Sequence, residues 1–326
     1  MTQPLVSIIL PTYKRAHLLK QAIDSVLAQS HATLELIVVD DNSPDDTAQV
    51  MAGFDDPRIR YVKNDPNLKL PRALNRGFSL AKGEYLTWTS DDNLLAPTAI
   101  ERMVAALAQG DWDFVYADYW LFSEQDADGN PISPQHDRLP DTLRLEKGNH
   151  IGACFLYTRR LYEAVGDYDP ELFLVEDDDY FLRAAKQFRF THIAEPLYFF
   201  RRDDATLYVS RFPEVKASDL LVRVKNGVID IPEAIRSLAD LLMQHPEALG
   251  DRSLKRALDI RNRYSYRLGA WLTRRGMAKL TQRLHAEISP LFSAYLGGKQ
   301  DFGQTRTALL EHVAHHGKLA YVAPKG

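Results

Sequence analysis

The stretch YLTWTSDDNLL, residues 85–95, decides the fold. Its first half, Tyr85–Thr89, is a short apolar and β-branched run, and it stops at the adjacent carboxylates Asp91 and Asp92. A buried strand of an open α/β sheet delivers polar residues in this way to its carboxyl edge, where such folds bind their ligands. A polar turn after a strand is the alternative interpretation of this stretch taken alone. The neighbouring sequence decides between the two.

Strand-like and helix-like patterns alternate on both sides of this stretch. Apolar runs at Leu5–Leu10 and Leu34–Val39 predict buried strands, and the second ends at Asp40 and Asp41. Residues at helical spacing follow each strand, and the alternation continues to about residue 204. This order predicts βαβ units, so we expect an α/β fold with a mixed, mostly parallel sheet flanked by helices.

The pattern changes after about Ala205. Apolar residues then recur mainly at helical spacing, and one candidate strand remains at Leu319–Val322. We therefore expect a front domain over 1–204 and a mainly helical C-terminal appendage over 205–326. The appendage carries 19 Lys+Arg against 11 Asp+Glu, a net charge of +8, whereas the front domain carries 21 against 33, a net charge of -12. This asymmetry indicates two functional surfaces.

The composition excludes several classes of protein. Of the 326 residues, 45% are hydrophobic, which is enough for a large core and argues against general disorder. The single cysteine, Cys154, excludes an internal disulfide framework, and its apolar neighbours predict a core residue rather than a nucleophile. No apolar run approaches the ~20 residues that cross a bilayer. The N-terminal MTQPLVSIIL enters a strand without a basic leader region, so we expect a cytoplasmic protein.

Acidic clusters mark three element ends in the α/β half. Asp40-Asp41 and Asp91-Asp92 follow strands, and Glu176–Asp179 begin a helix. Neighbouring carboxylates repel one another unless a cation or a proton intervenes. A hard divalent ion such as Mg²⁺ or Mn²⁺, completed by substrate phosphates, is therefore expected beside Asp91-Asp92. Asp177 could then act as a general base toward a hydroxyl. The alternatives are a helix cap for Asp40-Asp41 and a favourable helix dipole for Glu176–Asp179.

Four stretches in order carry a family resemblance: PLVSIILPTYKR, LELIVVDDNSPDDT, ALNRGFSLAKGEYLTWTSDD and EDDDYFLRAA. Over roughly residues 4–204 the chain resembles the family 2 glycosyltransferases, which have the GT-A fold with a Rossmann-like sheet. The WTSDDN and VDDNS motifs are most similar to the spore-coat polysaccharide synthesis type. The resemblance implies a metal-dependent, inverting transferase, with the nucleotide-sugar bound by residues 1–95 and the acceptor by residues 96–204.

The resemblance also implies roles for individual residues. Asp91 would contact the ribose, and Asp92 would hold the metal that bridges the diphosphate. Asp177 would deprotonate the acceptor hydroxyl, with Glu176 and His150 on the acceptor side. The remaining nucleotide-binding residues would be Pro11, Tyr13, Arg15, Asp40, Asp41, Lys69 and Arg72, with Asp41 accepting a hydrogen bond from the base imide.

Two positions depart from the family pattern. Thr89 stands where many members have an Asp, and Asp203, in FFRRDD, stands where many have a His that completes the metal shell. Asp203 could serve as an oxygen ligand, or that ligand is missing. Because of these departures, an alternative interpretation is a catalytically weak relative that binds nucleotide-sugar or glycan without transferring the sugar. A sugar-phosphate nucleotidylyltransferase is a further alternative, although PTYKR provides no glycine-rich loop.

A basic segment in the appendage, residues 252–283, holds ten Lys+Arg and one acid, Asp259. A helix of this kind can lie on anionic headgroups or receive a lipid-diphosphate acceptor. The alternative is a solvated bundle face that pairs with the front domain or with another subunit in a homo-oligomer. No nucleic-acid recognition motif accompanies the charge.

These observations together predict the reaction and its place in the cell. We expect transfer of a sugar from a UDP- or dTDP-sugar to a glycan or lipid-linked acceptor in surface polysaccharide synthesis. The enzyme would work in the cytoplasm, with a peripheral contact at the inner face of the membrane through residues 252–283.

Overall fold

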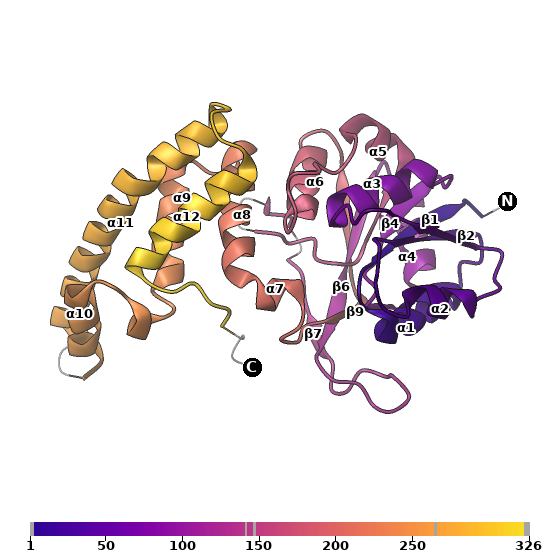
Figure 1. The fold of residues 1–326 in the computed structure, drawn as a ribbon, viewed down its shortest axis with the longest axis horizontal. Coiled ribbons are helices and arrows are strands. Elements are labelled where there is room, and N and C mark those ends of the chain that lie inside the picture. The colour runs from indigo at the N-terminus through magenta and orange to yellow at the C-terminus, as the bar shows by residue number, and fades with distance from the viewer. Residues whose placement is uncertain (1–2, 141, 146–147, 264–265, 323–326) are drawn as a thin grey trace. The chain divides into compact units, whose positions relative to one another are not determined.

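The computed structural model describes residues 3–140, 142–145, 148–263 and 266–322, and Figure 1 shows its helices and strands. The chain divides into two compact units, Met1–Thr206 and Leu207–Gly326. We call them the N-terminal unit and the C-terminal unit. The N-terminal unit contains the sheet, and the described part of the C-terminal unit is helical.

A single sheet, nine-stranded in the described residues, forms the centre of the N-terminal unit. Its strand order is β3-β2-β1-β4-β8-β6-β9-β5, and β7 pairs with β6. β1 to β4 are parallel, as are β6 and β9, whereas β5, β7 and β8 run antiparallel to their partners. This confirms the expected mixed, mostly parallel α/β sheet. The strands are β1 Val6–Thr12, β2 Leu34–Asp40, β3 Ile59–Lys63, β4 Tyr85–Trp88, β5 Leu94–Leu95, β6 Phe114–Phe122, β7 Gln135–Asp137, β8 Phe155–Thr158 and β9 Phe190–Arg201.

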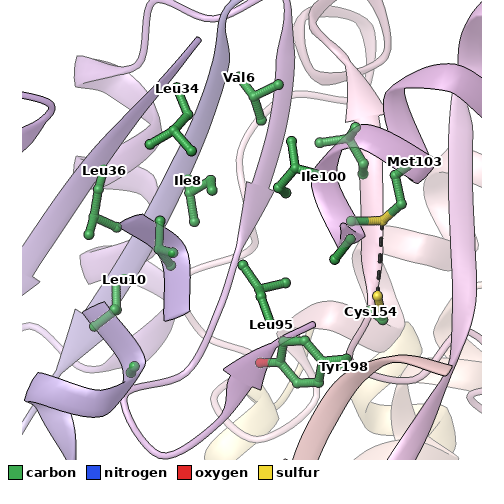
Figure 2. Packing of buried hydrophobic residues seen from close by; sticks show 14 of the residues in the cluster. Val6, Ile8, Leu10, Leu34, Leu36, Leu95, Ile100, Met103, Cys154 and Tyr198 are labelled. Carbon is green, nitrogen blue, oxygen red and sulfur yellow. Dashed lines mark hydrogen bonds between the residues drawn. The ribbon is translucent and has the colours of Figure 1, made fainter. Parts of the chain in front are cut away.

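Helices bury both faces of this sheet. Successive residues of a strand point to opposite faces, so Ile8 packs with α1, α2 and α4, whereas Ile9 packs with α3, α5 and α6. Figure 2 shows the first of these clusters, with Ile8 beside Leu36. Burial on both faces explains why β1 and β2 are continuous apolar runs rather than alternating ones. The helices are α1 Ala16–Leu27, α2 Thr47–Ala52, α3 Leu70–Leu80, α4 Ala99–Ala108, α5 Arg159–Val165 and α6 Glu176–Ala185.

An aromatic cluster under α6 fixes the position of that helix. Tyr180 stacks on Tyr168 with ring centroids 4.3 Å apart. Phe181 packs edge-on against Phe114 and Phe155, at 5.4 and 5.1 Å. Each such pair contributes about 0.5–1.5 kcal/mol beyond the burial of its area. The acidic first turn of α6 is therefore held rigidly beside the sheet.

Cys154 lies in the core, as its apolar neighbours predict. Its side chain is buried, and Sγ lies 4.0 Å from Sδ of Met103 on α4, as Figure 2 shows. Burial raises the pKa of the Cys154 thiol, and the charge of Asp118 acts in the same direction. A thiol of this kind is a poor nucleophile at neutral pH, because the thiolate is the reactive form.

The described part of the C-terminal unit consists of helices and their connections. The Leu319–Val322 strand prediction is wrong, because these residues have no strand partner, although Leu319 is buried. A short apolar run has no periodicity that separates a strand from a packed tail. No described helix has both the length and the apolar character to span a membrane. The helices are α7 Leu207–Ser210, α8 Phe212–Lys225, α9 Ile231–Leu242, the short 3₁₀ helix η2 Pro246–Ala248, α10 Arg252–Arg263, α11 Tyr266–Leu296 and α12 Phe302–His316.

Candidate active site

The carboxyl ends of β1, β2 and β4 meet at one edge of the sheet. β1 lies between β2 and β4 and is parallel to both, with Thr12 opposite Asp40 and Ile9 opposite Trp88. The segments that follow these strands therefore lie together. Three segments therefore meet at this edge, as the sequence predicts: residues 13–15, Asp40-Asp41 and Asp91-Asp92.

Asp91 and Asp92 share one cation, Arg15. The Nη1 of Arg15 donates to Oδ2 of Asp92 and lies 3.8 Å from Oδ1 of Asp91. Both carboxylates are buried, with relative exposures of 6% and 9%. Burial raises the pKa of Asp91, and the positive charge of Arg15 opposes that rise. The guanidinium thus offsets part of the repulsion between two adjacent acids.

Asp41 organises the loop that leads into α3. Its Oδ1 accepts hydrogen bonds from Nδ2 of Asn64 and from the backbone N–H of Leu68, both at 2.8 Å. Its Oδ2 accepts from the backbone N–H of Lys69, also at 2.8 Å. A buried carboxylate with three donors is a strong local anchor, because hydrogen bonds to a charged group contribute about 1.5–3 kcal/mol each.

Asp40 is held by the loop that follows β2 and by Tyr61 on β3. Its Oδ1 accepts from the backbone N–H of Ser43 and its Oδ2 from the hydroxyl of Tyr61, both at 2.7 Å. Burial raises the pKa of Tyr61, and its hydrogen bond to Asp40 adds to the rise. Both oxygens of Asp40 are therefore engaged by protein groups.

Three non-glycine residues at this edge have left-handed backbone conformations. They are Lys14, Asn42 and Lys69, with φ values of 60°, 64° and 70°. Such conformations are uncommon for residues with a Cβ, and they concentrate at binding sites where the surrounding structure enforces them. Lys14 and Asn42 lie just after β1 and β2, and Lys69 lies just before α3. Their positions support a binding function for this edge of the sheet.

The other residues predicted to bind nucleotide differ in their surroundings. Pro11 is buried in β1, whereas Tyr13 is 41% exposed with Nζ of Lys14 5.0 Å from its ring centroid. Lys69 is exposed at the start of α3. Arg72 donates to Glu171 at 2.6 Å and to the carbonyl of Pro170 at 3.3 Å, in the loop before α6. Arg72 therefore connects α3 to the loop before α6.

The first turn of α6 presents a pair of carboxyl groups in different environments. Asp177 is half-buried, and its Oδ2 accepts from Nδ2 of Asn149 at 3.3 Å. Glu176 is only 4% exposed and accepts from the backbone N–H of Leu174 at 2.9 Å. Burial, reinforced by the charge of Asp177, raises the pKa of Glu176 to about 8. Burial therefore favours the protonated form of Glu176 near neutral pH.

The backbone before this pair is strained. Leu174, two residues before Glu176, has φ 88°. A leucine in this conformation costs on the order of 1–3 kcal/mol, and such strain clusters at active sites.

His150, which the family resemblance predicts on the acceptor side, follows Asn149 in the same loop. Its side chain is half-buried. The carbonyl of the Asn149 side chain accepts from the backbone N–H groups of Ile151 and Gly152, at 3.1 and 3.2 Å. The same amide therefore closes the loop turn and aims its N–H at Asp177.

The two positions that depart from the family pattern are both engaged by protein groups. The hydroxyl of Thr89 lies 2.7 Å from that of Tyr198, and Oδ1 of Asp203 accepts from the backbone N–H groups of Ala205 and Thr206. Oδ2 of Asp203 lies 3.6 Å from Nη1 of Arg201. Among the described residues no three His, Cys, Asp or Glu side chains form a metal-binding group.

Asp92 can still offer one oxygen ligand to a hard cation. Mg²⁺ is commonly held by one or two carboxylates together with substrate phosphates and water. The residues present fit that mode, in which the substrate supplies much of the shell. They do not fit a metal held entirely by protein side chains.

Two residues of the site escaped the sequence prediction. Asn149 precedes His150 in a loop without periodicity, and nothing in its neighbours indicates a contact with Asp177 28 positions away. Arg201 donates its backbone N–H to Oδ1 of Asn93 at 2.8 Å, and its Nε lies 3.4 Å from the carbonyl of Asp92. Its place between Asp203 and the Asp91-Asp92 segment depends on the pairing of β9.

The model of glycosyl transferase family 2 matches residues 7–166. WcaA of Escherichia coli K12, a candidate colanic acid biosynthesis glycosyl transferase, is 34% identical over 57% of this chain and 67% of its own length.

Two further relatives extend this comparison. An uncharacterized glycosyltransferase of Rickettsia felis is 32% identical over 66% of this chain, which spans 35% of that relative. WfgD of Escherichia coli, a UDP-Glc:α-D-GlcNAc-diphosphoundecaprenol β-1,3-glucosyltransferase, is 30% identical over 41% of this chain and 53% of its own length. The chain thus spans only about a third to a half of these two proteins.

Solved structures share the fold at low sequence identity. S. aureus TarS 1-349 in complex with UDP has a TM-score of 0.54 at 16% identity, over 95% of this chain and 89% of its own. The mannosyltransferase PcManGT of Pyrobaculum calidifontis, in complex with GDP-Man and Mn²⁺, has a TM-score of 0.55 at 16% identity, over 87% and 88%. This likeness confirms the GT-A fold.

Proposed function

The chain belongs to glycosyl transferase family 2, and from this we propose that it transfers a sugar from a UDP- or dTDP-sugar to a hydroxyl of a glycan or lipid-linked acceptor. Surface polysaccharide synthesis of the spore-coat type is the process we propose. The names of two relatives support the reaction class, since WfgD uses UDP-Glc with a lipid-diphosphate acceptor and WcaA is a candidate colanic acid biosynthesis glycosyl transferase.

The observation that carries this proposal is the environment of Asp177. A general base must be ionised and must be aimed at the group from which it takes a proton. Glu176, with a pKa of about 8, stays neutral beside it, and the amide of Asn149 orients its carboxylate. Asp177 takes the proton of the acceptor hydroxyl, and the oxygen attacks the anomeric carbon as the bond to the diphosphate breaks. Attack opposite the leaving group inverts the configuration at that carbon.

The strand edge supplies the donor site in this proposal. Tyr13 and Pro11 line the base pocket, and Asp41 with the 64–69 loop borders it. Asp91 binds the ribose, and Arg15 faces the diphosphate. Lys69, at the start of α3 with its left-handed backbone, is placed to approach the nucleotide. Asp40 and Arg72 support the site through their bonds to Tyr61 and Glu171.

Mn²⁺ or Mg²⁺ belongs to the proposal as a partner of the substrate. Asp92 would hold the ion together with the diphosphate, and Asp203 is a further candidate oxygen ligand. When bound, the ion would neutralise negative charge on the leaving nucleoside diphosphate. The Mn²⁺ in the PcManGT complex supports this part of the proposal. The single buried cysteine fits a reducing compartment, and we place the reaction in the cytoplasm.

The test uses two neighbouring carboxylates of α6. Asp177→Asn should abolish release of nucleoside diphosphate from a panel of UDP- and dTDP-sugars with Mn²⁺, while thermal shifts by UDP persist. Asp178→Asn, one position along the same helix, is the matched control and should keep its activity. Full activity of the Asp177→Asn enzyme would overturn the assignment of the base. A wild-type protein that binds nucleotide but turns over none of the panel would favour the non-transferring alternative.

A further inference from the structure

The first turns of α11 expose two large apolar side chains. Leu268 is 52% exposed and Trp271 is 55% exposed. Single exposed apolar residues are common on protein surfaces, whereas contiguous exposed apolar side chains indicate an interaction site. Positions i and i+3 are neighbours on a helix, so the two side chains lie on one face. α11 is the long helix labelled in Figure 1.

Three arginines surround this apolar pair. Arg267, Arg274 and Arg275 are all exposed, and they lie four, three and four positions from Trp271. The guanidinium of Arg275 lies 5.6 Å from the Trp271 ring centroid, within range of a cation–π contact. Spacings of three and four place these residues on the same side of the helix as Trp271. We call Arg267, Leu268, Trp271, Arg274 and Arg275 the α11 face.

The charge of the α11 face is not compensated locally. None of its three guanidinium groups forms an ion pair with another residue in the described ranges. Residues 252–283 hold ten Lys+Arg against the single acid Asp259. On a solvated helix face, acids three or four positions from the bases would form stabilising pairs, and none of these three arginines has such an acid. Its charge therefore favours a polyanionic partner.

We propose that the α11 face binds the surface of a bilayer that contains anionic phospholipid. Guanidinium groups bind phosphate oxygens through paired hydrogen bonds. Tryptophan is the side chain most suited to the headgroup level, where its ring is apolar and its N–H is polar. Basic residues around one or two apolar anchors are the combination that holds a helix in the plane of the interface. A nucleic acid would use the arginines but would give no reason for Leu268 beside them.

This contact deepens the proposed function without depending on it. If the acceptor is lipid-linked, the α11 face brings the enzyme to the surface that contains the acceptor, and that consequence rests on the proposed function. The binding itself does not, because it needs neither donor nor acceptor. Asp177→Asn should therefore bind vesicles as the wild type does.

The test is sedimentation of the full-length protein with vesicles of phosphatidylcholine, with and without phosphatidylglycerol. Binding should require the anionic lipid and should weaken with salt. The triple variant Arg267→Gln, Arg274→Gln, Arg275→Gln should bind about 100-fold more weakly, because each basic residue near an anionic surface contributes about fivefold. The control triple Lys82→Gln, Lys299→Gln, Lys318→Gln makes the same change in net charge at exposed positions elsewhere and should bind like the wild type.

Tryptophan fluorescence gives a second, independent measurement. Anionic vesicles should shift the emission of the wild type to the blue, because Trp271 moves from water to the headgroup region. The shift should vanish in Trp271→Phe, a variant that keeps an apolar ring and so keeps most of its binding. Equal losses in the two triple variants would overturn the proposal, as would equal binding to neutral vesicles. An RNA affinity that exceeds that for anionic vesicles, or self-association that Trp271→Ala abolishes, would assign the face to a different partner.

Discussion

The Glu176→Gln substitution tests the charge state of the carboxyl pair on α6. Burial and the neighbouring Asp177 raise the pKa of Glu176 from 4.5 to about 8. In the unfolded chain the glutamate ionises near its ordinary pKa, so between these two values the native state binds one proton that the unfolded state has lost. The free energy of unfolding therefore falls as the pH rises through this window.

The size of the effect follows from the shift. At 1.36 kcal/mol per pH unit, raising the pKa from 4.5 to about 8 corresponds to ~5 kcal/mol. The stabilising contribution of the protonated glutamate is fully present below about pH 4.5 and is lost once the pH exceeds about 8. Glutamine removes the titration and keeps an oxygen that can accept from the N–H of Leu174, which Glu176 does at 2.9 Å.

The assay is urea unfolding at several pH values between about 5 and 8, followed by intrinsic fluorescence. Relative to the wild type, Glu176→Gln should gain stability as the pH rises, by several kcal/mol across the window. The exposed Glu163 on α5 offers the control, and Glu163→Gln should track the wild type at every pH. If the difference between Glu176→Gln and the wild type does not change with pH, Glu176 is ionised in the native state, and its proposed neutral role beside Asp177 is refuted.

Three further predictions concern other parts of the N-terminal unit. Gly83→Ala should destabilise the protein by about 1–3 kcal/mol in urea or thermal unfolding, the range typical of overpacked cores. The reason is that a Cβ there would lie 2.6 Å from the backbone nitrogen of Ser7. An unchanged midpoint would contradict that close approach. Cys154 should resist thiol reagents in the native protein and react in urea, since its thiol is buried with a raised pKa. Arg15→Gln should strengthen nucleotide-free Mn²⁺ binding, measured by electron paramagnetic resonance, because it removes the cation paired with Asp92; unchanged or weaker binding would count against Asp92 as the ligand.

The sequence by itself determined the architecture of the N-terminal unit. Apolar runs of strand length alternate with helical patterns, and these local periods are set by which side chains must be buried. Parallel strands present their carboxyl ends at one edge, so the positions of Asp40-Asp41 and Asp91-Asp92 could be predicted without coordinates. The apolar run Leu34–Val39 was predicted as a buried strand, and β2 spans Leu34–Asp40. The Leu319–Val322 strand failed because four apolar residues carry no period.

Only the tertiary structure decided which side chains meet. Arg15 pairs with Asp92 across 77 positions, Asn149 reaches Asp177 across 28, and Thr89 meets Tyr198 across 109. These contacts depend on the strand order and on the register of β8 and β9, which no local pattern encodes. The burial that raises the pKa of Glu176 is likewise a property of the tertiary structure. Burial by distant segments controls desolvation, and desolvation controls the charge on which the proposed chemistry depends.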